Sequence, residues 1–492
     1  MNYIGVDLGT SSVKIILMDE SGKVKNSVTK EYPLSFPNPG WSEQSPMEWY
    51  DKTIEGIKEL LLHQDTQIAG IGVGGQMHGL VVLDEKDDVI RPAILWNDGR
   101  TTEENNYLNQ VIGEEKLAEY TSNISFTGFT APKILWVEKH EPENFSKIKK
   151  IMLPKDYLVY RLSGAFSTDV SDASGMLLLD VKNRCWSKEM LDICHIREEQ
   201  LPKLYESYEA VGSLKNDIVS ELGITPCGGQ NKDEVLVVAG AGDNAAAAVA
   251  TGTVYDGACN LSVGTSGTVF IATKDYKATT NHAIHNFCDS TGAYHYMGCM
   301  LSAASCNLWW MQDVLGTKDF AKEQADIKEE NLGENSVYYL PYLMGERSPH
   351  NDEKIRGAFL GLSMDTTRAD MTQAMLEGVA FGLKDSLEVA RDLGIKVETS
   401  KICGGGVKSP LWQKIIANVL NVKLEILVSE EGPSLGGAIM AAVANGSYAS
   451  VEDACKQIIK IDHEVVPDAT LVKKYDKKYE TYKKFYPALK GI

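Results

Sequence analysis

The chain has 492 residues, of which 43% are hydrophobic and 24% are charged, and its formal net charge is −19 at pH 7. A chain of this length exceeds the usual size of one domain, so we expect at least two domains, each with its own core. The negative charge disfavours nucleic acid and anionic membrane surfaces as partners, and the longest apolar runs are far too short to span a bilayer.

The cysteines and the first residues indicate the compartment. The nine cysteines are scattered and include no Cys-x-x-Cys pair, which is typical of free thiols in a reducing compartment. The chain enters an apolar strand directly, with no basic segment or apolar leader ahead of it. We therefore expect a cytoplasmic protein.

Residues 3–14 (YIGVDLGTSSVK) predict two strands joined by a polar turn. Asp7 ends the first apolar run, and Gly9 opens a turn that carries the hydroxyls of Thr10 to Ser12. Backbone N–H groups and hydroxyls in such a turn can hold a phosphate, and a nearby carboxylate can hold a metal ion on that phosphate. An ordinary hairpin with a polar tip is the alternative.

The next elements predict a mixed α/β layer. A third strand is expected over 24–32, and a helix is expected to begin at Pro46, since Ser45 is a favoured N-cap and proline suits the first helical position. An apolar strand over 67–75 follows and ends in glycines. The order strand-strand-strand-helix-strand is typical of such a layer.

The segment Gln76-Met77-His78-Gly79 follows this strand directly. Ligands of α/β sheets bind beyond the carboxyl ends of strands, so His78 is a candidate for a binding site, and the alternative is a histidine with a partner in a loop. Arg100 closes a second polar cluster at 96–100 and is either a ligand contact or, as is commoner for arginine, part of a surface ion pair.

Two further segments precede the middle of the chain. A helix is expected to start at Pro132, and another at Pro154. The serine- and aspartate-rich loop after the second helix lacks the regular ligand spacing of a calcium loop, so we interpret it as structural.

Residues 235–251 (VLVVAGAGDNAAAAVAT) predict an apolar strand, a glycine-containing turn and an alanine-rich helix, with Asp243 at the junction. A carboxylate there can accept a proton from a bound hydroxyl, and the nearby helix N-terminus favours its ionised form. The alternative is that Asp243 only caps the helix.

The second half repeats the layout of the first. Residues 259–271 (CNLSVGTSGTVFI) again predict strand, Gly-Thr-Ser turn and strand, followed by a strand over 294–300 and a long helix over 368–393. The strand at 401–406 ends in glycines that could let a flat purine lie against the backbone, or could form a bulge or tight turn. This repetition suggests a duplicated domain with a nucleotide held between the copies.

The C-terminal region predicts two helices of different character. Residues 432–441 (GPSLGGAIMA) start a helix whose small residues permit close packing. The Lys- and Tyr-rich stretch over 472–484 is interpreted as a solvated helix face rather than a binding patch.

Two long segments resemble the sequence signatures of the FGGY carbohydrate kinases, whose fold is shared with actin, hexokinase and the heat-shock chaperone ATPases. They are residues 128–140 (GFTAPKILWVEKH) and 357–377 (GAFLGLSMDTTRADMTQAMLE). The resemblance implies an α/β fold of two ribonuclease H-like domains with a cleft between them. It implies an N-terminal, sugar-binding domain over 1–245 and a C-terminal, nucleotide-binding domain over 246–492.

Within the family, the segments GWSEQ (40–44), GQMHG (75–79) and GERSPHND (345–352) resemble those of xylulose kinases. Glycerol kinases carry an Arg-Glu pair where Met77 and His78 stand, which argues against glycerol. The resemblance implies phosphorylation of D-xylulose at its 5-hydroxyl, with ATP and Mg²⁺ as cofactors, and it is compatible with a homodimer. The alternatives are a kinase for another ketose or polyol, such as ribulose or L-xylulose, and an actin-like ATPase that acts on no sugar.

The resemblance also implies residue roles. Asp243 is the expected base toward the sugar hydroxyl, and Asp7 is expected to act near Mg²⁺, which it would hold through water. The expected sugar contacts are Met77, His78, Asp243 and Asn244. The expected nucleotide contacts are Thr10, Ser11, Ser12, Thr265, Gly405 and Ser409, the last replacing an asparagine that contacts adenosine in some relatives.

Overall fold

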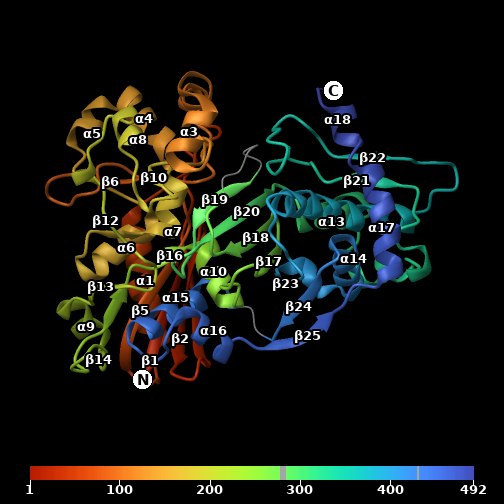
Figure 1. Ribbon diagram of the computed structural model, residues 1–492. Helices are drawn as coiled ribbons and strands as arrows, with labels where there is room; N and C mark the ends of the chain where they lie inside the picture. Colours follow the sequence, from red (N-terminus) through yellow and green to blue (C-terminus); the bar gives the residue numbers. More distant parts are fainter. Residues whose placement is uncertain (278–283, 429–430, 492) are drawn as a thin grey trace. The chain divides into compact units, whose positions relative to one another are not determined.

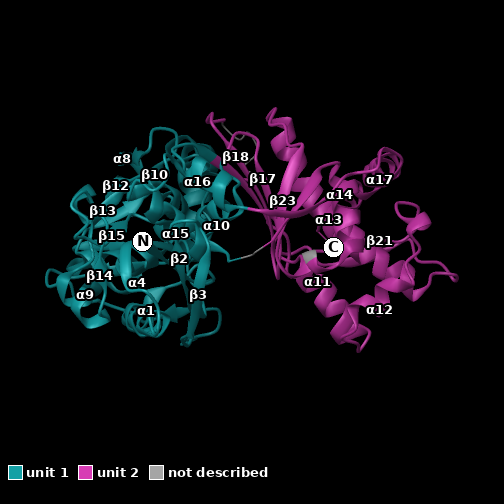
Figure 2. Ribbon diagram, turned by 90° about the horizontal axis from the view of Figure 1, so that it is seen from below, with its two compact units in different colours: residues 1–254, 286–294, 431–459 teal, residues 255–285, 295–430, 460–492 magenta. Residues whose placement is uncertain are grey.

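The computed structural model describes residues 1–277, 284–428 and 431–491 (Figure 1). The chain forms two compact units, which Figure 2 distinguishes by colour. Unit 1 comprises residues 1–254, 286–294 and 431–459, and unit 2 comprises residues 255–285, 295–430 and 460–492. Unit 1 therefore includes two segments from the second half of the sequence.

The sheet of unit 1 grows from the predicted strand meander. Strands β1 (Asn2–Leu8), β2 (Ser12–Asp19) and β3 (Val24–Glu31) pair antiparallel, and β5 (Gln67–Gly75) lies parallel to β1 on its other side. The full order is β13-β15-β5-β1-β2-β3. The strands β13 (Ala210–Ser213) and β15 (Leu236–Val238) complete this order, and the short strands β14 (Thr225–Pro226) and β16 (Ala241–Gly242) also pair with β5.

Apolar side chains on both faces of this sheet are buried against helices. Along β1, Ile4, Val6 and Leu8 pack in the core beneath one group of helices, whereas Tyr3 belongs to the core on the opposite face. The first group is α1 (Pro46–Leu60), α6 (Pro154–Ser163) and α9 (Asn216–Leu222). The second group is α10 (Asp243–Thr251), α15 (Pro433–Ala444) and α16 (Val451–Ile458).

Helix α15 lies directly on β1 and β5, although it is distant from them in sequence (Figure 1). A Cβ atom added to Gly5 would lie 1.8 Å from the carbonyl oxygen of Ser434, and one added to Gly72 would lie 2.0 Å from that of Gly437. Only glycine in the strands permits so close an approach of helix and sheet backbones. The predicted close packing of the small-residue helix is thus confirmed.

Unit 2 repeats the sheet of unit 1. Its order is β20-β18-β17-β23-β24-β25, in which β17, β23 and β24 are parallel and β25 is antiparallel to β24. Unit 1 has the same pattern in β3-β2-β1-β5-β15-β13. The strands of unit 2 are β17 (Cys259–Val263), β18 (Gly267–Thr273), β20 (Tyr294–Met300), β23 (Thr399–Cys403), β24 (Lys423–Leu427) and β25 (Ile461–Val465). The predicted duplication of an α/β domain is confirmed.

The core of unit 2 is built around three long helices: α13 (Arg368–Asp392), α14 (Pro410–Leu420) and α17 (Ala469–Tyr482). The predicted helix over 368–393 is confirmed, because a threonine at 367 caps it and its apolar stripe is buried. Strand β21 (Tyr338–Leu340) pairs with β22 (Ala358–Leu360) in a separate two-stranded sheet.

The remaining elements are short. In unit 1 they are β4 (Glu43–Gln44), β6 (Val81–Leu83), β7 (Ala93–Ile94), α2 (Thr102–Asn106), a π-helix (Tyr107–Gly113), α3 (Glu114–Thr121), α4 (Thr130–His140), α5 (Pro142–Lys147), β8 (Lys150–Met152), β9 (Ser167–Asp169), α7 (Val170–Ala173), β10 (Leu179–Asp180), β11 (Cys185–Trp186), α8 (Lys188–Ile193), β12 (Lys203–Tyr205) and most of β19 (His285–Cys288). In unit 2 they are α11 (Ala304–Trp309), a π-helix (Trp310–Val314), α12 (Phe320–Ala325), a 3₁₀ turn (Gly405–Lys408) and α18 (Phe485–Leu489).

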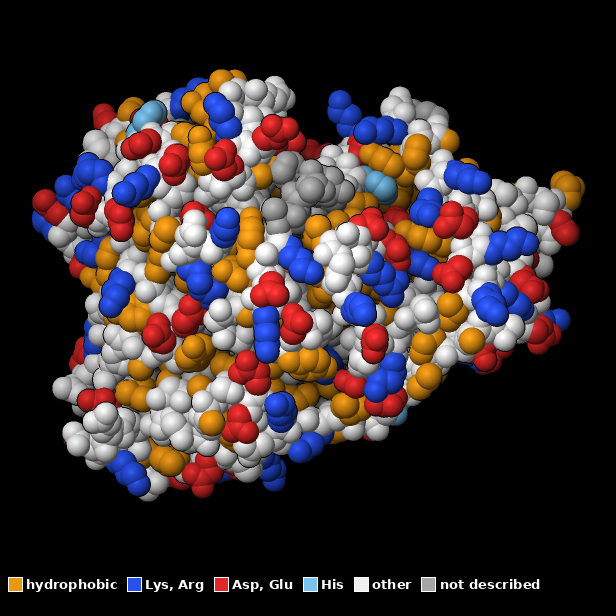
Figure 3. All heavy atoms as spheres, in the orientation of Figure 1, with side chains coloured by type: hydrophobic (Ala, Val, Ile, Leu, Met, Phe, Trp, Pro, Cys, Tyr) orange, Lys and Arg blue, Asp and Glu red, His pale blue; other side chains and the backbone are white. Residues whose placement is uncertain are grey.

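The surface carries charges of both signs, and the cysteines, which all lie within the described residues, form no disulfide bonds. Acidic and basic side chains are interspersed over the face seen in Figure 3. The nine cysteines are all free thiols. Within the described residues, no helix combines the length and the apolar character that crossing a membrane requires.

Candidate functional site

Strand pairing in unit 1 brings Asp7 and Asp243 to the same end of the sheet. Asp7 lies opposite Gly74 in the parallel pair β1–β5, and Gly242 lies opposite Gly75 in the parallel pair β16–β5. Asp243 follows Gly242 directly, so both carboxylates lie at the carboxyl ends of neighbouring parallel strands. Open α/β sheets bind their ligands at this edge.

The two carboxylates share an environment that opposes their ionisation. Burial raises the pKa of Asp243 to about 6, although its Oδ1 accepts hydrogen bonds of 2.7 and 2.9 Å from the backbone and side-chain nitrogens of Asn244. Burial and the charge of Asp243 raise the pKa of Asp7 to about 7, against the opposing effect of Lys14. Perturbed carboxylates that share a site are typical of catalytic centres.

Asp243 is the first residue of α10, and the N-cap position belongs to Gly242. Its carboxylate accepts from the backbone N–H of Asn244, so it satisfies one N–H group of the first turn without occupying the N-cap position. The first turn of α10 still places backbone N–H groups close to this carboxylate, which favours a negative charge there.

The carboxylate of Asp7 has the character of a cation ligand. Among the described residues it has no recorded hydrogen bond or ion pair, and the neighbouring Lys14 pairs with Glu431 at 2.7 Å instead. The described residues include no cluster of three or more His, Cys, Asp or Glu suited to a metal ion. Mg²⁺ is commonly held by one or two carboxylates together with water and substrate phosphates, and Asp7 fits that pattern.

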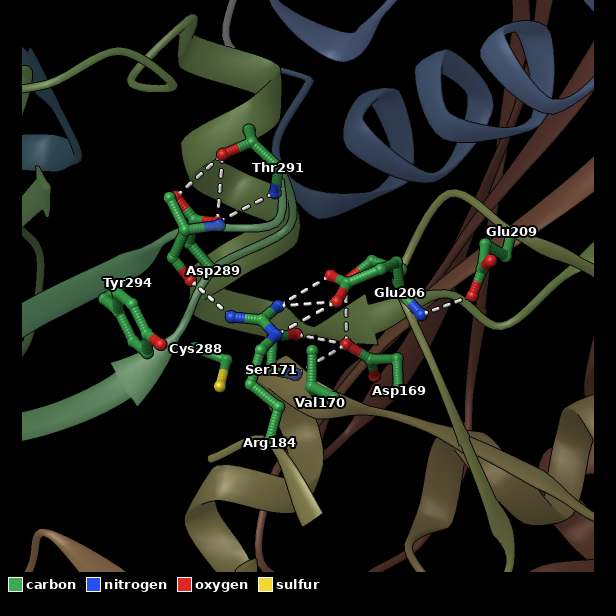
Figure 4. A network of polar contacts seen from close by, with 12 residues as sticks. Asp169, Val170, Ser171, Arg184, Glu206, Glu209, Cys288, Asp289, Thr291 and Tyr294 are labelled. Atoms are coloured by element: carbon green, nitrogen blue, oxygen red, sulfur yellow. Dashed lines mark hydrogen bonds and ion pairs between the residues drawn. The ribbon is translucent and has the colours of Figure 1, made fainter. Parts of the chain in front are cut away.

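A buried polar network fixes the chain just before Asp243. The N–H of Gly242 donates to Ser171 Oγ at 3.2 Å, and Ser171 Oγ donates to Asp169 at 2.5 Å (Figure 4). Asp169 also accepts a hydrogen bond of 2.7 Å from Ser207. Asp169 and Ser171 come from the serine- and aspartate-rich segment, so its interpretation as structural is consistent with its position.

The same loop surrounds a fully buried lysine. Lys155 Nζ lies 2.7 Å from Asp156, 3.1 Å from Asp169 and 3.9 Å from Asp172, and it donates to the carbonyl oxygen of Ala239 at 3.0 Å. These carboxylates outweigh the effect of burial and raise the pKa of Lys155, whereas burial raises the pKa of Asp172. Sequence reasoning missed this cluster, because its members are joined only by tertiary packing.

Met77 lies beside Asp243 and Asn244 at the start of α10. Its sulfur is 3.9 Å from Asn244 Nδ2, and a Cβ atom added to Gly242 would lie 2.9 Å from the Met77 side chain. Met77 is almost fully buried, at 4% exposure. The structure therefore brings Met77, Asp243 and Asn244 together.

His78 has a positive φ of 68° and is fixed on two sides. Its Nδ1 lies 2.7 Å from the carbonyl oxygen of Gly175, and its ring stacks on Phe129 with centroids 4.7 Å apart. A carbonyl can only accept, so Nδ1 carries a proton and donates it to this carbonyl. The hydrogen bond and the stacking together fix the orientation of the ring.

Lys133, a residue of the first sequence signature, hydrogen-bonds to the backbone of His78. Lys133 is fully buried and donates to the carbonyl oxygens of His78 and Gly128 at 2.8 and 2.7 Å. Burial lowers the pKa of Lys133 well below its ordinary value. The helix that carries Lys133 begins at Thr130 and not at Pro132, because two residues before the proline already adopt helical geometry.

Arg100 is buried, so its interpretation as a surface ion pair is wrong. Its side chain is 1% exposed and lies 2.7 Å from Asp98 and 2.8 Å from Glu43. The guanidinium also lies 3.7 Å from the ring centroid of Trp41 and 4.9 Å from that of Trp136. Arg100 thus holds the loop at 40–44 against helix α4.

Unit 2 contains a cavity of about 880 Å³ beside its own Gly-Thr-Ser turn. Three residues predicted to contact a nucleotide, Thr265, Gly405 and Ser409, all line it. A cavity of this size suits a ligand as large as a nucleotide. The other predicted nucleotide contacts, Thr10 to Ser12, belong to unit 1.

Ser409 is engaged by protein groups at the wall of this cavity. Its hydroxyl caps α14 by accepting from the N–H of Trp412 at 3.2 Å, and it donates to Gln324 Oε1 at 2.5 Å. Sequence reasoning missed other residues of the wall, since they come from helices placed there by packing. They include Ser305, Phe320 and Gln324.

Comparison with known proteins identifies the family of the chain. The model of the N-terminal domain of the FGGY family of carbohydrate kinases matches residues 2–250, and the C-terminal domain model matches residues 259–445. The chain belongs to the FGGY family of carbohydrate kinases. As a member of this family it is a sugar kinase, which confirms the predicted fold class and enzyme class.

Individual relatives match over nearly the whole chain. A xylulose kinase from Escherichia coli K12 is 38% identical over 99% of this chain and 99% of its own length. A solved structure described as a xyloylose kinase, from Brucella ovis, has a TM-score of 0.94 at 38% identity and covers 99% of both chains. The structure of a gluconate kinase from Lactobacillus acidophilus has a TM-score of 0.93 at 26% identity, covering 99% of this FGGY kinase and 98% of its own chain.

Proposed function

We propose that this kinase transfers the γ-phosphoryl group of ATP to the 5-hydroxyl of D-xylulose. The observation that carries the proposal is the grouping of Met77 and Asn244 around the carboxylate of Asp243 at the carboxyl edge of the sheet. Full-length relatives described as xylulose kinases support the choice of sugar.

Asp243 is the proposed general base. With a pKa of about 6 it is ionised at neutral pH, yet it is more basic than an ordinary aspartate. It can accept the proton of the sugar hydroxyl as that oxygen attacks phosphorus. Met77, His78 and Asn244 are the proposed sugar contacts.

The bound cofactor supplies the electrophilic phosphorus and the leaving ADP, with Mg²⁺ neutralising the phosphate charge. Asp7 is the proposed ligand of this ion through water, and Thr10, Ser11 and Ser12 the proposed contacts of the transferred group. Thr265, Gly405 and Ser409 are proposed to hold the nucleotide in the cavity of unit 2. We retain residues 1–245 and 246–492 as the proposed sugar-binding and nucleotide-binding domains, and cytoplasmic location as a proposal.

A panel of sugars tests this function. Purified protein is assayed for sugar-dependent ADP release with D-xylulose, D-ribulose, L-xylulose, glycerol and gluconate. We expect the highest kcat/KM with D-xylulose. A tenfold preference for another compound, which corresponds to about 1.4 kcal/mol in transition-state binding, would assign that compound as the substrate instead.

Gluconate is included because the gluconate kinase from Lactobacillus acidophilus shares the fold closely. The same assay also addresses the alternative of an actin-like ATPase. ADP release that is independent of every sugar, together with ATP-dependent light scattering from filaments, would favour that alternative.

A further inference from the structure

The side chain of Gln44 occupies the centre of a buried hydrogen-bond network next to the turn at residues 9–12, which follows β1. Its Nε2 donates to the carbonyl oxygens of Thr10 at 2.7 Å and Pro33 at 3.3 Å. Its Oε1 accepts from Trp49 Nε1 at 3.0 Å and Gln76 Nε2 at 3.3 Å. Gln44 is 3% exposed, so all four bonds are shielded from water.

The orientation of this amide follows from its partners. The indole N–H of Trp49 can only donate, and the carbonyl of Thr10 can only accept. Oε1 of Gln44 must therefore face Trp49, and Nε2 must face the turn. The amide cannot be flipped without setting donor against donor and acceptor against acceptor.

The network holds two consecutive carbonyl groups of the turn. Gly9 O accepts from Tyr32 OH at 2.5 Å and from Gln76 Nε2 at 3.3 Å, while Thr10 O accepts from Gln44. In a trans peptide the N–H points opposite to the C=O of the same plane. The N–H groups of Thr10 and Ser11 therefore point away from these side chains, and the described part of the chain records no partner for either of them.

We propose that Gln44 is a positioning residue for phosphoryl transfer, which orients the N–H groups of Thr10 and Ser11 toward the transferred group. Through Gln76 it also joins this turn to the adjacent segment Met77-His78. The inference rests on the proposed function for the identity of the bound group. The geometry that it describes, a turn held by one side-chain amide, does not depend on that function.

Gln44→Glu tests the proposal with little change of shape. A carboxylate can still accept from Trp49 and Gln76, but its second oxygen would face the carbonyl of Thr10 and repel it. We expect kcat to fall about 10- to 100-fold, because small displacements of positioning groups cost that much. The KM for the sugar should stay within about threefold, since Gln44 contacts no predicted sugar-binding residue directly.

Gln67→Glu is the matched control, because it makes the same chemical change at an exposed position of β5. It should leave kcat and both KM values unchanged. Trp49→Phe provides a second comparison, since it removes one bond to Gln44 Oε1 but leaves Nε2 bonded to Thr10. It should lower the Tm and keep kcat near that of the wild type. Equal losses of kcat in Trp49→Phe and Gln44→Glu at equal Tm would overturn the proposal in favour of a purely structural role.

Hydrogen–deuterium exchange provides a readout that is independent of activity. The amide of Gly9, whose N–H donates to Ser12 O across the turn at 3.0 Å, should exchange at least about tenfold faster in Gln44→Glu than in the wild type or in Gln67→Glu, because the turn loses its support. Unchanged exchange in Gln44→Glu would overturn the positioning role. If the wild type phosphorylates no sugar of the panel, the proposed function fails, while the exchange rates still decide the role of Gln44.

Discussion

The first two carbonyl groups of the turn after β1 in unit 1 accept hydrogen bonds from side chains, whereas those of the turn after β17 in unit 2 accept mainly from backbone N–H groups, with Ser305 Oγ as a further donor to Thr265 O at 2.7 Å. In unit 2, Gly264 O accepts from the N–H of Ala304 at 2.7 Å, and Thr265 O accepts from the N–H of Ala303 at 3.0 Å. In unit 1 the equivalent carbonyls accept from Tyr32, Gln44 and Gln76.

The copies also differ in the residue that precedes the turn. Asp7 lies two positions before Gly9, and Ser262 lies two positions before Gly264. The turn of unit 2 is also shorter by one residue, because Val263 pairs with Gly267 whereas Leu8 pairs with Val13. The copy in unit 1 thus carries a carboxylate before its turn, and the copy in unit 2 borders a large cavity. Changes in unit 1 should therefore affect kcat, and changes in unit 2 should affect the KM for ATP.

The largest expected effect comes from removing the carboxylate of Asp243, the proposed general base in unit 1. Asp243→Ala should lower kcat by about 10³-fold or more, since positioned general bases contribute about 10² to 10⁴ in rate. Nucleotide affinity, measured by calorimetry, should stay within threefold of the wild type. A variant that retained a tenth of the wild-type kcat would contradict the assignment of Asp243 as the base.

Much of this arrangement could be predicted from sequence, because it depends on local patterns. The strand–turn–strand motifs, the strand over 294–300 and the convergence of Asp7 and Asp243 at one sheet edge follow from alternation, turn residues and the behaviour of parallel strands. Helix α1 begins at Pro46 as predicted, although the Ser45 side chain makes no capping hydrogen bond.

The remainder depends on contacts between segments distant in sequence. Residues 431–459 join unit 1 because Gly5 and Gly72 let α15 approach the sheet. The sequence around these glycines does not indicate which helix packs on them. Lys155 is surrounded by carboxylates that come from two different elements. Ser409 was expected to contact the nucleotide, but its partner Gln324 lies on a separate helix. The roles of the site residues are still predictions.

A smaller effect concerns the free energy of unfolding, which should depend on pH because of the buried carboxylate of Asp243 in unit 1. The folded state raises the pKa of Asp243 from 3.8 to about 6, so it binds the proton more tightly than the unfolded chain does. Wild-type stability is therefore lost as the pH rises from about 4 to 6. Asp243→Asn removes this charge and with it the repulsion that raises the pKa of Asp7. The Oδ1 of the new asparagine can still accept hydrogen bonds from Asn244.

We expect Asp243→Asn to be more stable than the wild type by about 2–3 kcal/mol at pH 7.5, from about 1.36 kcal/mol per pKa unit. The gain should disappear below about pH 3, where the wild-type carboxyl is protonated in both states. Urea denaturation at the two pH values, without Mg²⁺, measures the difference. An identical difference at both pH values would show that Asp243 is not the group responsible.

The smallest effect tests the cavity of unit 2. A Cβ atom added to Gly405 would meet no atom within 4 Å, and this glycine lies at the cavity wall. Gly405→Val should therefore place its side chain in the space proposed for the nucleotide without straining the fold. We expect the KM for ATP to rise about tenfold, or about 1.4 kcal/mol, with the KM for the sugar unchanged.

Gly404→Ala is the matched comparison for Gly405→Val. Gly404 has a φ of +97°, and a Cβ atom there would lie 2.7 Å from the carbonyl oxygen of Val263. This neighbouring substitution should lower the Tm, because it strains the backbone and displaces the end of β17. If Gly405→Val instead changed kcat and left the KM for ATP unaltered, the division of roles between the two turns would be wrong, since a residue of the cavity would then act on the chemical step.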